Sequence, residues 1–381
     1  MKRPVILQGD PYIRDYYRKD ASTLLVETGG NTGNLAFRYA VASHLTAPTI
    51  LPWDAPIEAI REAGDIIVLP LANQLGRHTD LSREAYKLAR MDLPVIGIGL
   101  GAQAATFEEN IALNSGTSAW IAALASHAPA AHPNIGVRGT YTADQIAKLG
   151  WPNAAAVIGC PSNFINLHDD VADAVAKGFD RKIRHVAVAA GIPYINALAD
   201  TERSLAKIVT ATSGAYIVQH DIEMIRLARG DYDALTPDLF QQCRNYILPT
   251  STDDEFKAWL RRYAYAFFDV PAWMDFLRRF DFVIGTRFHG IMLAIQAGVP
   301  AGCIAHDSRT LEMCQTMRVP VCHYRDIGGN LNCSNMLDYF EFDAKQYRET
   351  RRMLCSNYVA LLTAAELPFN NGLRRIAGLP K

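Results

Sequence analysis

Short, wholly apolar runs recur along this chain, and each is followed by a glycine or polar turn and then by a stretch with helical spacing. These runs lack the alternation of polar and apolar residues that marks a strand with one exposed face. They therefore predict strands buried on both faces of a parallel sheet. We expect such strands at residues 65–69, 94–98, 185–189, 215–218, 280–284 and 301–305.

Helical spacing fills the intervals between these strands, at residues 201–212, 253–267, 291–297 and 308–317. Alternating strands and helices are typical of a doubly wound α/β fold. The rhythm breaks after Phe164, and a fresh strand begins near His185. We therefore predict two Rossmann-like domains, at residues 1–165 and 166–342, with a small anionic substrate bound in the cleft between them.

The C-terminal part, residues 343–381, is predicted to be a long helix (343–366) and a tail. An apolar stripe at helical spacing lies opposite a basic side. One interpretation is a packed helix with a solvated basic face; the other is a basic face that rests on an anionic membrane surface. The stripe consists of Tyr347, Leu354, Tyr358, Leu361 and Ala365, and the basic side of Lys345, Arg348, Arg351 and Arg352.

The composition of the chain argues for a globular protein of two domains and against several functional classes. A chain of 381 residues fits two domains of ordinary size, and its formal net charge of −1 argues against a nucleic-acid partner. The 7 cysteines form no CxxC pair, which favours a reducing compartment. The N-terminus is unlike a signal peptide, and no apolar stretch approaches the roughly 20 residues of a membrane span. We expect a cytoplasmic protein without a metal site or cofactor.

The strongest local signal is the run FDFVIGTRFHG, which ends at Gly290 and leads into IMLAIQAGVP. A buried strand followed by a helix places Thr286, Arg287 and His289 at the carboxyl edge of the sheet, where open α/β sheets bind ligands. Arginine offers a fork of donors to phosphate or carboxylate, and histidine exchanges protons near neutral pH. The competing interpretation is an ion-paired arginine and a hydrogen-bonded wall histidine.

Two further strands end in similar groups. The strand at 301–305 is followed by His306, Asp307, Ser308 and Arg309, and in the N-terminal half the strand IGV is followed by Arg138. The turn GCPS closes the next strand, AAAVI, and its cysteine is interpreted as a buried filler.

Glycine turns supply the remaining candidates. The turn after LLVE, interpreted as a strand end, precedes an apparent helix, so its N–H groups could bind an anion or a hydroxyl; the alternative is a plain turn with Asn34 as the helix cap. A GxGxxA match follows the strand at 94–98, and a glycine-lined strand end is favoured there over a dinucleotide site. The candidate residues are Gly29, Gly30, Asn31 and Asn34 in the first turn, and Gly99 and Gly101 in the second.

Taken together, these segments resemble the polysaccharide pyruvyl transferases. The resemblance rests on TRFHGIMLAIQAGVP with AHDSR after it, on GVRGTYTADQIAKLG, on GCPS and on GGNTGN, and it spans residues 28 to about 320 in the family's order. RFHG followed by a helix and GVP is the specific part. The departures are Gly139 and Asn34, where an acid is common, Phe288 in place of leucine, and Arg309 in place of lysine.

The resemblance implies a glycosyltransferase-B-like architecture and transfer of the pyruvyl unit of phosphoenolpyruvate onto two hydroxyls of a sugar, in cell-surface or exopolysaccharide synthesis. Position by position, Arg138 and Arg287 match the anion-binding arginines, His289 the catalytic histidine and Asp307 the acidic position after the next strand. The acceptor sugar could be free or linked to a nucleotide, a lipid or a polymer.

Two other functions remain open at this point. A nucleotide-sugar glycosyltransferase of the same fold would also use arginine and a helix end, and would release a nucleoside diphosphate. A glycan-binding or assembly protein would bind sugar without turnover.

Overall fold

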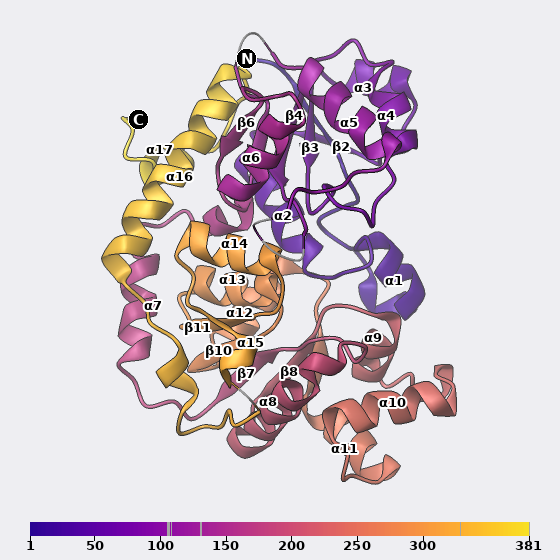
Figure 1. Cartoon of the computed structure of the whole chain (residues 1–381), viewed down its shortest axis with the longest axis vertical. Coiled ribbons are helices and arrows are strands. Elements are labelled where there is room, and N and C mark those ends of the chain that lie inside the picture. Colours follow the sequence, from indigo (N-terminus) through magenta and orange to yellow (C-terminus); the bar gives the residue numbers. More distant parts are fainter. Residues whose placement is uncertain (105–106, 108, 130–131, 328, 381) are drawn as a thin grey trace.

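The computed structural model describes residues 1–104, 107, 109–129, 132–327 and 329–380. Within them, two parallel six-stranded sheets follow one another along the chain (Figure 1). The first has the order β2-β1-β3-β4-β5-β6 and the second β12-β11-β10-β7-β8-β9. The doubly wound two-domain fold predicted from the sequence, of the glycosyltransferase-B-like kind, is therefore confirmed.

The strands are short and mostly buried on both faces, as wholly apolar runs require. The first sheet consists of β1 (Pro4–Leu7), β2 (Thr49–Leu51), β3 (Ile66–Pro70), β4 (Val95–Leu100), β5 (Ile135–Val137) and β6 (Ala155–Val157). The second consists of β7 (Val186–Ala189), β8 (Ala215–Val218), β9 (Ala264–Ala266), β10 (Phe282–Gly285), β11 (Ala301–Ala305) and β12 (Val321–His323).

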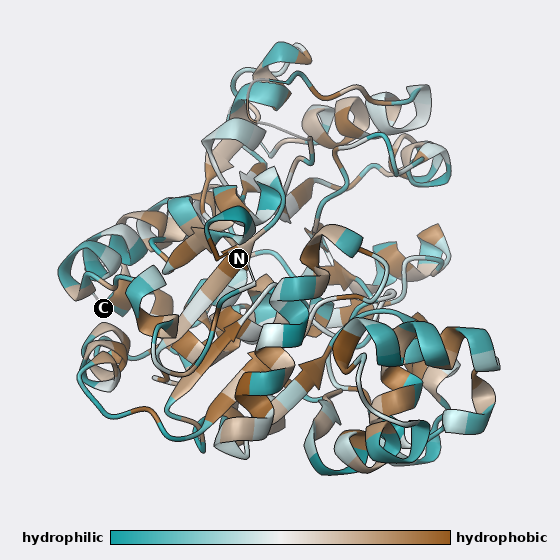
Figure 2. Cartoon of the chain, turned by 60° about the horizontal axis from the view of Figure 1, so that its bottom comes forward, coloured by the Kyte–Doolittle hydropathy of each residue, from teal (hydrophilic) through white to brown (hydrophobic). Residues whose placement is uncertain are grey.

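Helices cover the sheets, and Figure 2 shows apolar residues concentrated in the strands and polar ones on the outer helices. The helices of the first half are α1 (Ala21–Glu27), α2 (Asn34–His44), α3 (Ile57–Ala63), α4 (Ser82–Leu88), α5 (Ser115–Ser126) and α6 (Thr140–Lys148). The second half has α7 (Val171–Phe179), α8 (Ala199–Thr212), α9 (Ile222–Arg229), α10 (Pro237–Ile247), α11 (Asp253–Tyr263), α12 (Val270–Leu277), α13 (Phe288–Gln296), α14 (Ser308–Met317) and α15 (Tyr324–Ile327), followed by α16 (Ala344–Ala364) and α17 (Asn371–Ile376).

All six strands predicted first from the apolar runs are present, within two residues at each end. The prediction of a strand at LLVE is wrong: this segment belongs to α1, where Asp20 caps the helix by accepting a hydrogen bond from Thr23 N. The predicted helix 253–267 is too long. It ends at Tyr263, and the next three residues pair with β8 as β9, so tertiary pairing overrides the local pattern there.

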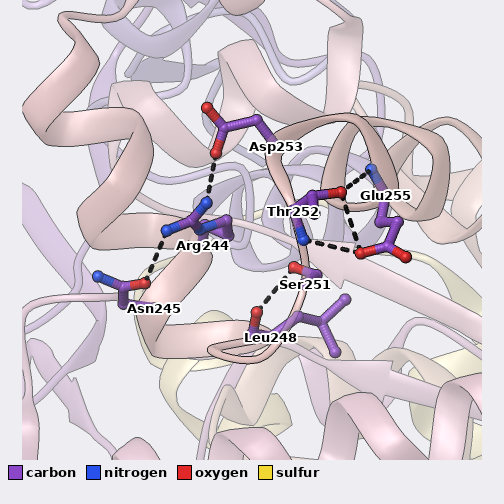
Figure 3. Close-up of polar contacts among 7 residues, drawn as sticks. All are labelled: Arg244, Asn245, Leu248, Ser251, Thr252, Asp253 and Glu255. Carbon is purple, nitrogen blue, oxygen red and sulfur yellow. Dashed lines mark hydrogen bonds and ion pairs between the residues drawn. The ribbon is translucent and has the colours of Figure 1, made fainter.

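The start of that helix follows from local chemistry (Figure 3). Thr252 Oγ1 accepts a hydrogen bond from Glu255 N, and the Glu255 carboxylate in turn accepts one from Thr252 N, which is a capping box. Arg244 of α10 pairs with Asp253 at 2.6 Å and ties the two helices together.

The long C-terminal helix is present as α16, and it contacts both β6 of the first half and α7 of the second (Figure 1). The interpretation that the basic side of this helix is exposed to solvent is wrong for Arg351. This side chain is buried and donates to the carbonyl oxygens of Asn163, Asn166 and His168. The domain boundaries stay a prediction. In the described part of the chain, no helix combines the length and the apolar character needed to cross a bilayer.

Candidate functional site

A cavity of about 450 Å³ lies where the carboxyl ends of strands from both sheets approach each other. Parallel strands present these ends at one edge of a sheet, and ligands of open α/β sheets bind there. The predicted site residues that line the cavity are Gly29, Asn31, Asn34, Arg138, Thr286, Arg287, His289 and Arg309. Arginines from the two halves of the chain are therefore brought to one cavity.

Arg138 directly follows β5, and its side chain is buried. Its Nη2 donates to Leu71 O at 3.4 Å, and its guanidinium lies 5.6 Å from the centre of the Phe37 ring. Gly101 makes room for it, because a Cβ at that position would lie 3.1 Å from Arg138 Cδ. Burial lowers the pKa of Arg138. In the described structure its Nε has no hydrogen-bond partner.

Thr286 and Arg287 follow β10, and Arg287 stands at the N-terminal boundary of α13. Within the described residues, Thr286 Oγ1 and Arg287 Nε and Nη2 are buried without hydrogen-bond partners. Burial lowers the pKa of Arg287, and the neighbouring Arg309 lowers it further. Unpaired buried donors of this kind are costly to the folded state and are satisfied when an anion binds.

His289 lies in the first turn of α13 and keeps part of its ring open to the cavity. Burial holds the pKa of His289 well below its usual value, and the positive charges of Arg138 and Arg309 act in the same direction. The imidazole is therefore neutral at neutral pH. On another side the ring meets protein, with Cys160 Sγ 3.7 Å from His289 Nε2 and the Phe37 ring centre at 5.7 Å.

Asp307 does not line the cavity. It caps α14 by accepting a hydrogen bond of 2.7 Å from Thr310 N, and its Oδ2 lies 3.1 Å from Arg309 Nη2. Burial acts to raise the pKa of Asp307, but Arg309, His306 and the bonds from Thr310 outweigh it and hold the pKa below its usual value. The carboxylate is thus ionised and holds Arg309 against the cavity.

The first glycine turn is built differently from the prediction. The N–H groups at the start of α2 are not free: the cap residue Gly33 donates to Asn31 Oδ1, and the first-turn residues Asn34 and Leu35 donate to the carbonyl oxygens of Asn31 and Thr32. Asn34 is the first residue of the helix and not its cap. Its amide donates to the carbonyl oxygens of Thr28 and Gly29 and so holds the turn in place at the wall of the cavity.

The remaining glycines lie outside the cavity wall. Gly30 has φ +82 and open space around its Cα, and Gly99 has φ +87 with Pro161 beside it. Both adopt the left-handed backbone region that favours glycine, which explains their residue type by conformation. Gly101 contributes to the site indirectly, because its missing side chain leaves room for Arg138.

Sequence reasoning missed several lining residues. Gln219 and His220 follow β8, and Asn73, Gln74 and His78 follow β3. The signal was present after β8, where the polar run at residues 219–221 directly follows a buried strand. After β3 it was weaker, because the apolar Leu71 and Ala72 come first. In the described part of the chain, no group of three or more His, Cys, Asp or Glu side chains is arranged to hold a metal ion.

The model of the polysaccharide pyruvyl transferase family matches residues 5–308 of the sequence. The chain belongs to this family. The match covers both sheets up to β11 and includes Arg138, Arg287 and His289. No protein of curated function matches the sequence.

Solved structures with a similar course of the chain are UDP-N-acetylglucosamine 2-epimerases and a plant protein. The epimerase from Rickettsia bellii is 10% identical with a TM-score of 0.46, covering 95% of each chain. The one from Methanocaldococcus jannaschii is 12% identical with a TM-score of 0.45, covering 94% of this chain and 99% of its own. UGT73P12 from Glycyrrhiza uralensis, in complex with glycyrrhetinic acid 3-O-monoglucuronide, is 11% identical with a TM-score of 0.41, covering 98% and 96%.

Proposed function

We propose that this protein transfers the pyruvyl unit of phosphoenolpyruvate onto two hydroxyls of a sugar and releases phosphate. The observation that carries the proposal is the set of three arginines, from both halves of the chain, around one cavity with a neutral histidine. Phosphoenolpyruvate bears a phosphate and a carboxylate. Such anions are bound by arginine through charge-assisted hydrogen bonds, and the free donors of Arg138 and Arg287 offer them.

The chemistry requires one proton at carbon and two acceptor hydroxyls. A proton added to the methylene carbon of the donor leaves cationic character at the neighbouring carbon, and a sugar hydroxyl attacks that carbon and loses its proton. The second hydroxyl then forms the other C–O bond and loses its proton as phosphate leaves with the electron pair. We assign the proton transfer to His289, which meets the cavity in a neutral state.

Binding of the donor raises the affinity of this histidine for a proton, which is the proton that the donor's methylene carbon must receive. Arg138 and Arg309 disfavour the imidazolium when the cavity is empty. An anion between these arginines offsets their charge, so the affinity of His289 for a proton rises as the donor binds. Asp307 is then a positioning residue for Arg309, not an acid.

The biological role that fits this reaction is modification of an acceptor sugar for a cell-surface or exopolysaccharide, in the cytoplasm. The test is a phosphate-release assay with phosphoenolpyruvate against free, nucleotide-linked and lipid-linked sugars, with the pyruvyl ketal identified by mass spectrometry. Phosphate release coupled to ketal formation is the expected result. Release of a nucleoside diphosphate from a nucleotide sugar, with no response to phosphoenolpyruvate, would establish glycosyl transfer instead.

A further inference from the structure

Arg38 of α2 lies between two glycines that leave room for its guanidinium. A Cβ at Gly9 would lie 2.8 Å from Arg38 Nη1, and one at Gly29 would lie 2.6 Å from Arg38 Nη2. Nη1 donates to Glu27 O at 2.9 Å, at the end of α1. Any other residue at these two positions would push the guanidinium aside.

The charge of Arg38 has no counter-charge within the described residues, since no carboxylate there forms an ion pair with it. The Glu27 carboxylate pairs with Lys19 at 2.8 Å, and the Asp10 carboxylate accepts a hydrogen bond from Tyr12 N. Burial lowers the pKa of Arg38. A largely buried cation without an anion destabilises the folded state, and a bound anion offsets that destabilisation.

The position of Arg38 in the fold is one where ligands bind. Its neighbour Gly9 follows β1, and the strand order reverses between β1 and β3. Gln8, also after β1, is 3% exposed, and neither its amide nitrogen nor its amide oxygen has a partner in the described structure. Gly29, beside the guanidinium, and Asn34 both line the cavity that Arg138, Arg287 and Arg309 also line, and Arg38 itself lies next to Gly29 just outside this lining.

We infer that Arg38 binds a second anion, a phosphate group carried by the acceptor sugar. The inference rests on the proposed function, because it is the donor that occupies the other arginines. A cavity of about 450 Å³ has room for more than the donor alone. The acceptor of this enzyme is therefore a sugar phosphate or diphosphate ester, and not a neutral free sugar.

The first experiment is calorimetric titration of inorganic pyrophosphate into protein saturated with phosphoenolpyruvate. Arg38→Gln removes the charge and keeps a polar side chain, and circular dichroism with thermal unfolding checks that the variant is folded. We expect pyrophosphate binding to weaken by about tenfold or more and phosphoenolpyruvate binding to stay unchanged, because one charge-assisted contact is removed. Arg14→Gln, at an exposed position, is the matched control. Equal pyrophosphate affinity in Arg38→Gln and the wild type overturns the inference.

A second measurement does not depend on a variant. Pyrophosphate should protect Arg38 of the wild-type protein from modification by phenylglyoxal, as read by mass spectrometry, and no protection would contradict the assignment. Arg287→Ala separates the two proposals, since it should lose phosphoenolpyruvate binding but keep the protection of Arg38. If the wild type binds no phosphoenolpyruvate, the proposed function fails, and the protection experiment still decides the role of Arg38.

Turnover distinguishes the two sources of the phosphate. In Arg38→Gln the KM for the true acceptor should rise about tenfold or more, whether it is a nucleotide diphosphate sugar or a polyprenyl diphosphate sugar, and the KM for phosphoenolpyruvate should not change. The acceptor whose KM responds identifies the carrier. A free sugar used as efficiently as both esters, by wild type and variant alike, would contradict the inference.

Discussion

The sulfur of Cys160 lies 3.7 Å from Nε2 of His289, and the two residues come from opposite halves of the chain. Cys160 follows β6 and is fully buried, and Ser162 Oγ lies 3.0 Å from its sulfur. The interpretation of this cysteine as a buried filler is thus incomplete, because it also borders the histidine that we assign to proton transfer. We expect this contact to help orient the imidazole ring of His289.

Replacing this thiol should affect the histidine more than the fold. We expect Cys160→Ala to reduce kcat by up to about tenfold, since a single hydrogen bond is worth about 0.5–1.5 kcal/mol. The pH profile of kcat should shift as well, while the KM for phosphoenolpyruvate stays constant. Cys160→Ser, which retains a donor, should restore the profile; an unchanged profile in the alanine variant would show that the contact is only packing.

Removal of the imidazole should separate chemistry from binding. His289→Asn is expected to lower kcat on the order of 10²–10⁴-fold, the usual contribution of a general acid or base. Calorimetry should show that donor affinity is largely kept, because the arginines remain. His132→Asn, at an exposed position, is the control. Near-normal turnover of the His289 variant would contradict its assigned role.

Loss of an arginine should weaken donor binding, whereas loss of the imidazole should slow the chemical step. Arg287→Ala removes charge-assisted hydrogen bonds worth about 1.5–3 kcal/mol, which corresponds to a donor affinity roughly 10- to 150-fold weaker. Titration calorimetry measures this directly, and Arg278→Ala, at an exposed position near the end of α12, is the matched control. Equal effects of the two substitutions would place the donor elsewhere.

Donor binding should be linked to proton uptake. The pKa of His289 lies well below its usual value because of burial and of Arg138 and Arg309, and an anion reverses the effect of the two arginines. Uptake is therefore expected as the donor binds, and it should grow as the pH falls below neutral. Calorimetry in buffers of different ionisation enthalpy gives the number of protons. The difference between wild type and His289→Asn isolates this group from the donor's own phosphate.

Acid should destabilise the fold through His44. Burial lowers the pKa of this histidine from 6.5 to about 4, while its Nε2 lies 3.0 Å from Phe164 O. Between these two values the unfolded state binds a proton that the folded state does not, so stability falls as the pH drops from 6.5 to 4. The loss is on the order of 3 kcal/mol at 1.36 kcal/mol per pKa unit. Urea unfolding at several pH values measures it, and His44→Gln should flatten the dependence.

The sequence alone predicted most of the parallel strands and the residues that follow them, although it indicated no strand for β1, β2, β9 or β12. A short, wholly apolar run between turn residues favours a strand covered on both faces, and the position after such a strand lies at the ligand-binding edge of the sheet. Arg138, Arg287 and Arg309 could therefore be selected without coordinates, since their placement depends on neighbours a few residues away.

Only the tertiary structure decided which of these residues share a cavity, because that depends on contacts between distant segments. Three features depend on segments that are far apart in the sequence, so periodicity cannot predict them. They are the contact between Cys160 and His289, the burial of Arg351 against carbonyl oxygens and the unpaired charge of Arg38. The same holds for LLVE, where the Asp20 cap and packing against α9 favour a helix over a strand. Local pattern measures the preference of a segment for a conformation, whereas the burial and charge of a side chain are set by the segments packed against it.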